Sequence, residues 1–299
     1  MTRLVIYASY DNQGIVHDYV ISYLKRLKRV ADKIIFIADN KAKAEEKQKL
    51  NGLVEFCDFA PHGEYDFGSY KRGYQYASKQ GLLEEADELI LCNDSCFSVM
   101  DFDQMFSEMN QRDCDFWGVT DSLEIQHHLQ SYFLVFKKNV FTHQEFANWL
   151  GAVTHKNDFR EIVKTYEVPL KSFLEKLGFK GESFIKAKTI CNQTEYPITL
   201  IHQKAPLLKR KVFVIGACSK ESVRGLLIFL KQDFNDCYRD ICNYFKTTFN
   251  RIFPLILPRD LELLKRLFYQ NKITKSGKSL IKICKIPLPI NFFRKKGLK

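Results

Sequence analysis

The 299-residue chain lacks the signals that would place it in several large protein classes. No apolar run reaches the roughly 18 residues that a membrane-spanning helix requires. Its nine cysteines form no C-x-x-C pair and no Cys/His array with zinc spacing, which excludes the common zinc modules. The first apolar run is short and ends in charge, so we expect no secretory signal, a cytoplasmic location and reduced thiols.

The standard phosphate-binding loops are also missing. The sequence contains no G-x-x-x-x-G-K-[ST] order, and no G-x-G-x-x-G follows the first apolar run. A nucleotide site in this chain would therefore use other groups than the usual ATP or dinucleotide loops.

Acidic residues are scarce toward the C-terminus. Residues 1–200 contain 24 basic and 29 acidic side chains, whereas residues 201–299 contain 22 and 6. From Leu263 to Lys299 there are 11 basic side chains and no acidic one. The asymmetry predicts a globular domain over residues 1–215 and a basic, amphipathic helical region over residues 216–299 that contacts something anionic.

Strand-like and helix-like segments alternate along the first part of the chain. Since short connections join them, the pattern predicts an α/β fold with a mainly parallel sheet covered on both faces. In such sheets, ligands bind at the carboxyl ends of the strands. Strands are expected at 3–10, 33–39, 53–59, 87–93, 115–120 and 130–141, and helices at 16–31, 68–86, 101–112, 143–153 and 161–178.

Two acidic motifs compete for a diphosphate and its metal. The D-C-D at 113–115 is a literal D-x-D, but it precedes its strand and so lies at the amino edge of a parallel sheet. The N-D-S at 93–95 follows its strand, at the ligand edge, so we favour Asp94 as a ligand of Mg²⁺ or Mn²⁺. One or two protein carboxylates suffice when a diphosphate supplies the remaining oxygens. The alternative is that Asp94 caps the next turn.

Other residues that follow predicted strands are candidates for donor binding for the same reason, because they lie at the carboxyl ends of the strands. An acidic residue after the second strand commonly contacts a ribose, although Asp39 also suits a simple turn. The segment 63–74 combines glycines with Asp66 and Lys71, and Ser69 is placed to cap a helix whose N-terminus would suit phosphate. The donor-binding set is Ser9, Tyr10, Asp11, Asp39, Asp66, Gly68, Lys71, Asn93, Asp94 and Ser95.

Six segments in order resemble a known family. They are YASYDNQGIVHDYVISYL, YDFGSYKRGY, LILCNDSC, DFWGVTDS, HLQSYFLVF and YEVPLKSFLEKLGF, within residues 3–215. Together they resemble the rhamnan synthesis protein F family, bacterial glycosyltransferases of surface-polysaccharide assembly. The resemblance implies a GT-A-like fold, a nucleotide-diphosphate sugar donor, with rhamnose or a similar sugar, and a growing or lipid-linked glycan as acceptor. Asp94 then falls where such enzymes keep their D-x-D, with one carboxylate in place of two.

The resemblance also implies roles for individual side chains. Glu167 is the first candidate for the catalytic base, because inverting GT-A enzymes often place that base at a helix start, and Asp121 is the second. His202 is the candidate for a further metal ligand, and a satisfied surface or core histidine is its alternative. For each carboxylate the alternative is a solvated surface position. Acceptor hydroxyls would contact Glu124, His128 and Gln130.

The basic C-terminal region combines charge with apolar faces. Leu261, Leu264 and Phe268 share one helical face, a pattern typical of segments that lie on anionic membranes. We therefore expect a glycosyltransferase that is peripheral on the inner face of the bacterial cytoplasmic membrane. Contact with a partner enzyme and nucleic-acid binding are the alternatives, although no nucleic-acid recognition motif is present. The competing function is a non-catalytic nucleotide- or glycan-binding subunit of a polysaccharide assembly complex.

Overall fold

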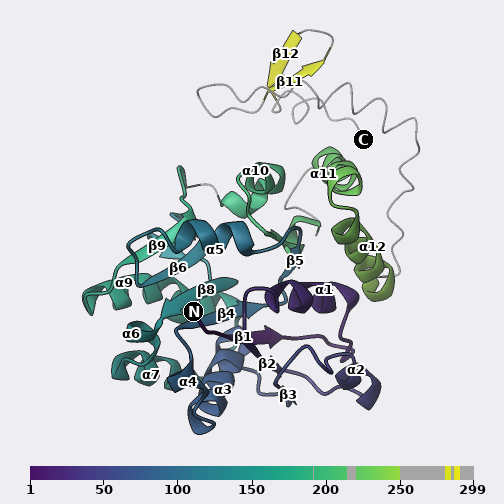
Figure 1. Ribbon diagram of the computed structural model, residues 1–299. Helices are drawn as coiled ribbons and strands as arrows, with labels where there is room; N and C mark the ends of the chain where they lie inside the picture. Colours follow the sequence, from purple (N-terminus) through teal and green to yellow (C-terminus); the bar gives the residue numbers. More distant parts are fainter. Residues whose placement is uncertain (191, 214–219, 250–279, 284–285, 290–299) are drawn as a thin grey trace.

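The computed structural model describes residues 1–299 except 191, 214–219, 250–279, 284–285 and 290–299. Its centre is one mixed sheet with helices on both faces (Figure 1). The apolar and basic faces predicted around Leu261, Leu264 and Phe268 lie outside the described residues. In the described part, no helix is both long and apolar enough to cross a membrane.

The sheet has eight strands in the order β3-β2-β1-β4-β8-β6-β7, with β9 paired to β6. β1 runs parallel to β2 and β4, whereas β8 is antiparallel to both β4 and β6. The expected α/β fold with a mainly parallel sheet flanked by helices is confirmed. The strands are β1 Arg3–Ser9, β2 Lys33–Ala38, β3 Phe56–Phe59, β4 Glu88–Asn93, β6 Phe116–Ser122, β7 His128–Leu129, β8 Phe133–Lys137 and β9 Gly181–Ile185.

The two faces of the sheet carry separate cores, because successive strand residues point to opposite sides. In β1, Val5 and Tyr7 join one core, and Leu4 and Ile6 join the other. The first core includes α1 Asp18–Leu27, α5 Asp103–Met109, α10 Pro197–His202, α11 Lys220–Asp233 and α12 Asn235–Phe249. The second includes α3 Tyr65–Lys79, α4 Leu82–Glu85, α6 Lys138–Phe141, α7 Gln144–Gly151, α8 Phe159–Ile162 and α9 Val168–Lys176. The short α2 Ala44–Gln48 has no buried residue.

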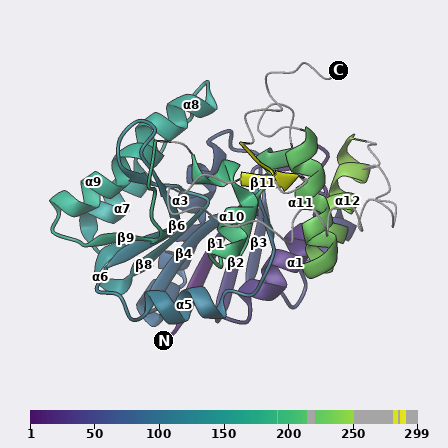
Figure 2. The same ribbon diagram turned by 90° about the horizontal axis from the view of Figure 1, so that it is seen from above.

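A small second sheet brings a late segment beside the end of β4. β5 Cys96–Ser98 pairs antiparallel with β10 Leu207–Lys209, and Lys209 lies opposite Cys96. α11 and α12 then lie side by side next to α1, at the right of Figure 2. Further on, β11 Leu280–Ile283 and β12 Ile286–Pro289 form an antiparallel pair. The domain boundary at residue 215 stays a prediction, although α12 buries Ile241 in the same core as α1.

Two helices differ from the prediction. α3 begins at Tyr65, so Ser69 lies inside the helix and contacts the His62 ring at 3.0 Å, and its expected role as a cap is wrong. The helix stops before Gly81, whose φ of 71° ends the regular backbone. The helix expected over 161–178 contains a π turn at Val163–Glu167. Pro169 has no N–H for the normal helical bond, which accounts for the irregular turn just before it.

The contact between α3 and β1 requires a glycine. A Cβ on Gly73 would lie 2.3 Å from Cγ2 of Ile6, a buried residue in the middle of β1. We expect Gly73→Ala to destabilise the fold by about 1–3 kcal/mol, because the sheet and the helix must separate to accept the methyl group. Urea unfolding of the purified chain measures this as a lower midpoint.

Gly151→Ala is the matched control for this substitution. Gly151 also lies in a helix, but a Cβ there meets no atom within 4 Å. Its midpoint should stay equal or rise slightly, since alanine favours helix. Equal destabilisation of both variants would contradict the packing argument.

Candidate active site

Polar residues gather where β1, β2 and β4 end. β4 lies parallel to β1 with Asn93 opposite Ala8, which brings Asp94 beside Ser9. The D-C-D at 113–115 precedes β6, at the opposite edge of the sheet, and the Asp113 side chain there is 86% exposed. The choice of Asp94 over this literal motif therefore agrees with the geometry of the sheet.

The carboxylate of Asp94 ties the ends of two strands together. One oxygen accepts hydrogen bonds from the Ser9 hydroxyl at 2.8 Å and from the Tyr10 backbone N–H at 2.9 Å. The other lies 3.3 Å from Nη2 of Arg210. Tyr10 itself is 57% exposed, so it is accessible to a ligand.

Sequence reasoning missed the two cations of this site, Lys209 and Arg210. Arg210 donates from Nη1 to the hydroxyls of Tyr19 at 2.7 Å and Tyr244 at 3.1 Å. Lys209 donates to the Ser95 hydroxyl at 2.9 Å. The pair follows two leucines in β10, so a strand ending in cations was visible in the sequence, but its position beside residues 93–95 was not.

Asp66 lies beside these groups, and the pKa of its carboxyl group is unusual. Its carboxylate accepts a 2.6 Å hydrogen bond from the side-chain amide of Asn93, which in turn accepts from the Ser95 hydroxyl. Burial and the neighbouring charge of Asp94 raise the pKa of Asp66 to about 7, although Lys209 acts in the opposite direction. Asp66 therefore gains and loses its proton near neutral pH. Such a group in a polar cluster is a common feature of functional sites.

Glu167 points into the same region from the end of the π turn. Its carboxylate accepts hydrogen bonds from the backbone N–H and the hydroxyl of Ser131, and it lies 3.7 Å from Nε2 of His128. Burial raises the pKa of Glu167, but the bonds from His128 and Ser131 outweigh it and lower the pKa below its ordinary value. Glu167 is therefore ionised at neutral pH. It is the last residue of the π turn and immediately precedes α9, inside the helix predicted over 161–178.

The candidates for acceptor contact form a hydrogen-bonded group next to Glu167. Gln130 accepts from Thr120 at 2.6 Å and donates to Asn192, and Asn192 donates to Glu124 at 2.9 Å. Burial lowers the pKa of His128, yet its contacts with Glu167 and a backbone carbonyl raise it overall. The structure thus brings Glu124, His128 and Gln130 together, with Asn192 as a link that sequence reasoning missed.

The carboxylate of Asp121, the second candidate for the base, already has partners within the protein. Its oxygens accept from the backbone N–H of Ala187 and contact Nε2 of His127 at 2.8 Å. Its side chain is 6% exposed, against 16% for Glu167. These contacts make Asp121 a residue that holds the segment after β9, and they leave Glu167 the more accessible carboxylate.

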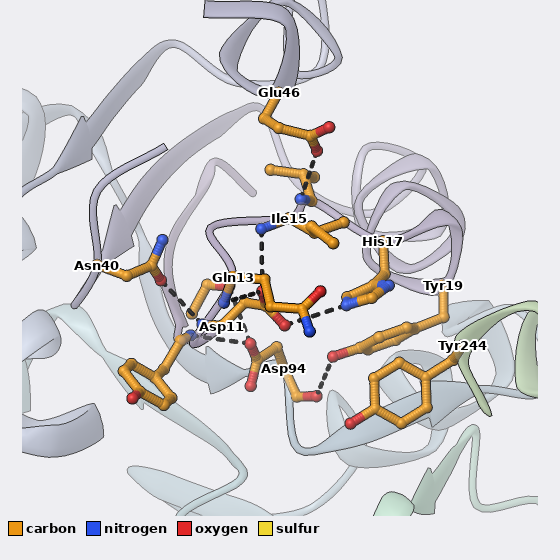
Figure 3. Close-up of polar contacts among 12 residues, drawn as sticks. Asp11, Gln13, Ile15, His17, Tyr19, Asn40, Glu46, Asp94 and Tyr244 are labelled. Carbon is orange, nitrogen blue, oxygen red and sulfur yellow. Dashed lines mark hydrogen bonds and ion pairs between the residues drawn. The ribbon is translucent and has the colours of Figure 1, made fainter. Parts of the chain in front are cut away.

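The loop after β1 is organised by Asp11. Its carboxylate accepts from the backbone N–H groups of Gln13 and Ile15 and lies 3.1 Å from Nε2 of His17. Figure 3 shows Asp11 between Asn40, which accepts its backbone N–H, and His17. Burial raises the pKa of Asp11, but these hydrogen bonds lower it overall. The visible role of Asp11 is to fix the loop that follows the strand.

The segment before α3 has a similar arrangement. Asp39 accepts from the backbone N–H of Gly63 at 2.8 Å, and Nζ of Lys71 lies 2.7 Å from the Glu64 carboxylate. A Cβ on Gly68 would lie 2.3 Å from Cβ of Glu64, so this glycine serves close packing. Lys71 is therefore paired with Glu64 at the start of α3, and its part in phosphate binding stays a prediction.

The predicted metal ligands do not come together. His202 is exposed on α10, and its ring packs 5.4 Å from that of Phe229. Both oxygens of Asp94 already accept protein hydrogen bonds or pair with Arg210. Throughout the described ranges, no group of three or more His, Cys, Asp or Glu side chains is placed to hold a metal ion. The Asp94 carboxylate thus faces a cation, Arg210, which disfavours a divalent ion beside it.

Comparison with known proteins finds a family whose model matches this chain. Residues 34–261 match the family described as Rhamnan synthesis protein F. The chain is 29% identical over 134 residues to the Virulence protein VirA of Vibrio anguillarum, which covers 43% of this chain and 42% of that protein. It is 22% identical over 181 residues to the uncharacterized protein y4gN of Sinorhizobium fredii, covering 59% and 46%. The chain thus spans less than half the length of these relatives.

A solved cytidylyltransferase from Leptospira borgpetersenii is similar in structure, with 10% identity, a TM-score of 0.42 and coverage of 83% of this chain and 94% of that chain. That likeness is too slight to support any statement about activity. The family match, in contrast, includes β2, β4, the π turn, β10 and α12, and it covers most of the sequence. The chain belongs to the rhamnan synthesis protein F family.

Proposed function

We propose that the chain is a glycosyltransferase that moves a sugar from a nucleotide-diphosphate donor to a growing or lipid-linked surface glycan. One observation carries the proposal: at the ligand edge of the sheet, the Asp94 carboxylate joins the end of β1 to Arg210, and Lys209 donates to Ser95 beside it. A buried carboxylate next to fixed cations suits a reaction in which charge moves between donor and acceptor. Membership of the family supports the same reading.

Glu167 is the residue that we assign as the base. The acceptor hydroxyl attacks the anomeric carbon of the donor sugar and forms the new glycosidic bond, while the bond to the diphosphate oxygen breaks. The hydroxyl proton passes to the Glu167 carboxylate, and the diphosphate leaves with the bonding electrons. The low pKa of Glu167 keeps it ready to accept the proton at neutral pH, and Ser131 holds its orientation.

The remaining roles follow from position. Exposed Tyr10 and the fixed loop around Asp11 lie where the nucleotide of the donor would bind, at the end of β1. Glu124, His128 and Gln130 lie next to Glu167, where the acceptor must enter. Rhamnose is the sugar that the family description favours. A position at the cytoplasmic membrane surface, held by the basic C-terminal region, is part of the proposal.

Nucleotide binding gives the first test. The purified chain should be stabilised by one of UDP, dTDP, GDP or CMP, by about 2.7 kcal/mol at a hundredfold excess over Kd. Asp94→Asn should lose this shift, because the neutral amide no longer holds Arg210 and the Tyr10 backbone together. A thermal-shift screen measures both.

Asp113→Asn is the control for that screen. It removes the same charge from the D-x-D at the amino edge and should keep the full shift. If no nucleotide stabilises the wild type, the globular domain does not bind a nucleotide donor. A nucleotide-dependent shift without transfer to any acceptor would instead favour the non-catalytic subunit.

Removal of the base should separate binding from transfer. Glu167→Gln keeps the shape and the contact with Ser131 but cannot accept the proton, so we expect transfer to fall by about 10²–10⁴-fold while nucleotide affinity stays within twofold. The assay follows labelled sugar from the donor that the screen selects into a lipid-linked glycan fraction. Glu161→Gln, on the exposed face of α8, is the matched control. Retained transfer in Glu167→Gln would move the role of base to Asp121.

The charge of Asp66 should make nucleotide binding depend on pH. Asp66 is neutral below its pKa of about 7 and negative above it, so affinity for an anionic nucleotide should weaken by roughly tenfold as pH rises from 6 to 8. Asp66→Asn should remove this part of the dependence and leave only that of the nucleotide itself. Calorimetric titrations at several pH values measure the difference. Identical pH profiles for both proteins would contradict the assignment.

A further inference from the structure

Two adjacent cations lie directly beside the segment 93–95. β10 pairs with β5, and the backbone N–H of Arg210 donates to the carbonyl of Ser95 at 2.8 Å. This pairing fixes Lys209 and Arg210 against residues that lie more than a hundred positions earlier. Their place is therefore set by the backbone ladder as well as by their side chains.

The guanidinium of Arg210 is held from three sides. Asp94 pairs with Nη2, and the hydroxyls of Tyr19 and Tyr244 accept from Nη1. The same two rings lie 5.4 and 5.2 Å from the guanidinium carbon. Burial lowers the pKa of Arg210, but Asp94 and Tyr19 raise it overall, so the charge persists. A cation held in this way loses little further freedom when it binds an anion.

Both side chains keep donors for a ligand. A guanidinium has five N–H donors, and the contacts of Arg210 within the described chain use three of them. An ammonium has three, and Lys209 uses one for Ser95 while it lies 4.4 Å from the centre of the Tyr132 ring. The remaining donors match the oxygens of a diphosphate, which arginine binds in a bidentate manner.

The same arrangement disfavours a divalent ion. A metal on Asp94 would sit within a few ångströms of the Arg210 guanidinium, which already lies 3.3 Å from one carboxylate oxygen. Like charges at that separation repel strongly in a partly buried site. The Ser95 hydroxyl, the other oxygen of the N-D-S motif, accepts from Lys209 and donates to Asn93.

We propose that Lys209 and Arg210 bind the diphosphate of the donor and stabilise the leaving group without a divalent metal ion, with Asp94 as the residue that positions Arg210. This proposal rests on the proposed transferase function and specifies how its leaving group is stabilised. When the bond to the sugar breaks, the diphosphate gains one negative charge, and the two fixed cations take it up.

Calorimetric titration of the full chain with the nucleoside diphosphate chosen by the screen tests this directly, once in EDTA and once in Mn²⁺. We expect equal affinity in both. Lys209→Met keeps the stem that covers Tyr132 and should weaken binding by about tenfold or more, as loss of a charged hydrogen bond implies. Arg210→Lys should do the same, because one ammonium cannot replace the planar fork. Lys211→Met removes an exposed cation next to them and should bind like the wild type.

The possible outcomes separate the two proposals. Binding that EDTA abolishes and Mn²⁺ restores overturns the metal-free mechanism and leaves the transferase function standing. Wild-type affinity in Lys209→Met, with its melting temperature unchanged, also overturns it. If Arg210→Lys unfolds, Lys209→Met still decides, because Lys209 contacts Ser95 and the Tyr132 ring. Absence of binding by the wild type under both conditions overturns the transferase function itself.

Discussion

The ion pair between Asp94 and Arg210 joins three parts of the chain that the sequence keeps far apart. Asp94 holds the end of β1 through Ser9 and Tyr10, and Arg210 extends from β10 to Tyr244 in α12. Because Asp94 is buried, removal of Arg210 leaves an uncompensated charge, and the loss of a partner in a fully buried pair commonly costs about 3–5 kcal/mol. The ligand edge of the sheet and the C-terminal helices are therefore energetically linked at one carboxylate.

This link also explains why the neighbouring carboxyl groups can differ in charge. Arg210 compensates Asp94, and His128 with Ser131 compensates Glu167. Within the described part of the chain, Asp66 accepts a hydrogen bond from the amide of Asn93, and burial and the charge of Asp94 are the main causes of its raised pKa. Asp66 and Glu167 thus have pKa values shifted in opposite directions, because the environment rather than the residue type decides their protonation.

The sequence predicted the sheet and its ligand edge well, because strand periodicity and the rule about carboxyl ends are local information. That is why Asp94 could be chosen over the more obvious motif at 113–115. Lys209 could not be assigned, since its partner Ser95 is brought to it only by the pairing of β5 with β10. The π turn before Glu167 was also hidden, because the apolar spacing around it suits an ordinary helix. The role of metal ligand could not be judged for His202 for the same reason, because a local sequence pattern does not tell which distant side chains come into contact.

The region after residue 215 has a part in the site that its basic composition does not suggest. Tyr244 contacts Arg210 with both its hydroxyl and its ring, and its ring centre lies 5.2 Å from that of Tyr19. α12 therefore completes one wall around the cation that holds Asp94. If α12 served only to anchor the chain to a membrane, the face that it buries against the domain would need only apolar side chains. A tyrosine hydroxyl aimed at a buried arginine is better explained by a demand for a fixed positive charge, which a diphosphate-binding site has and a surface anchor does not.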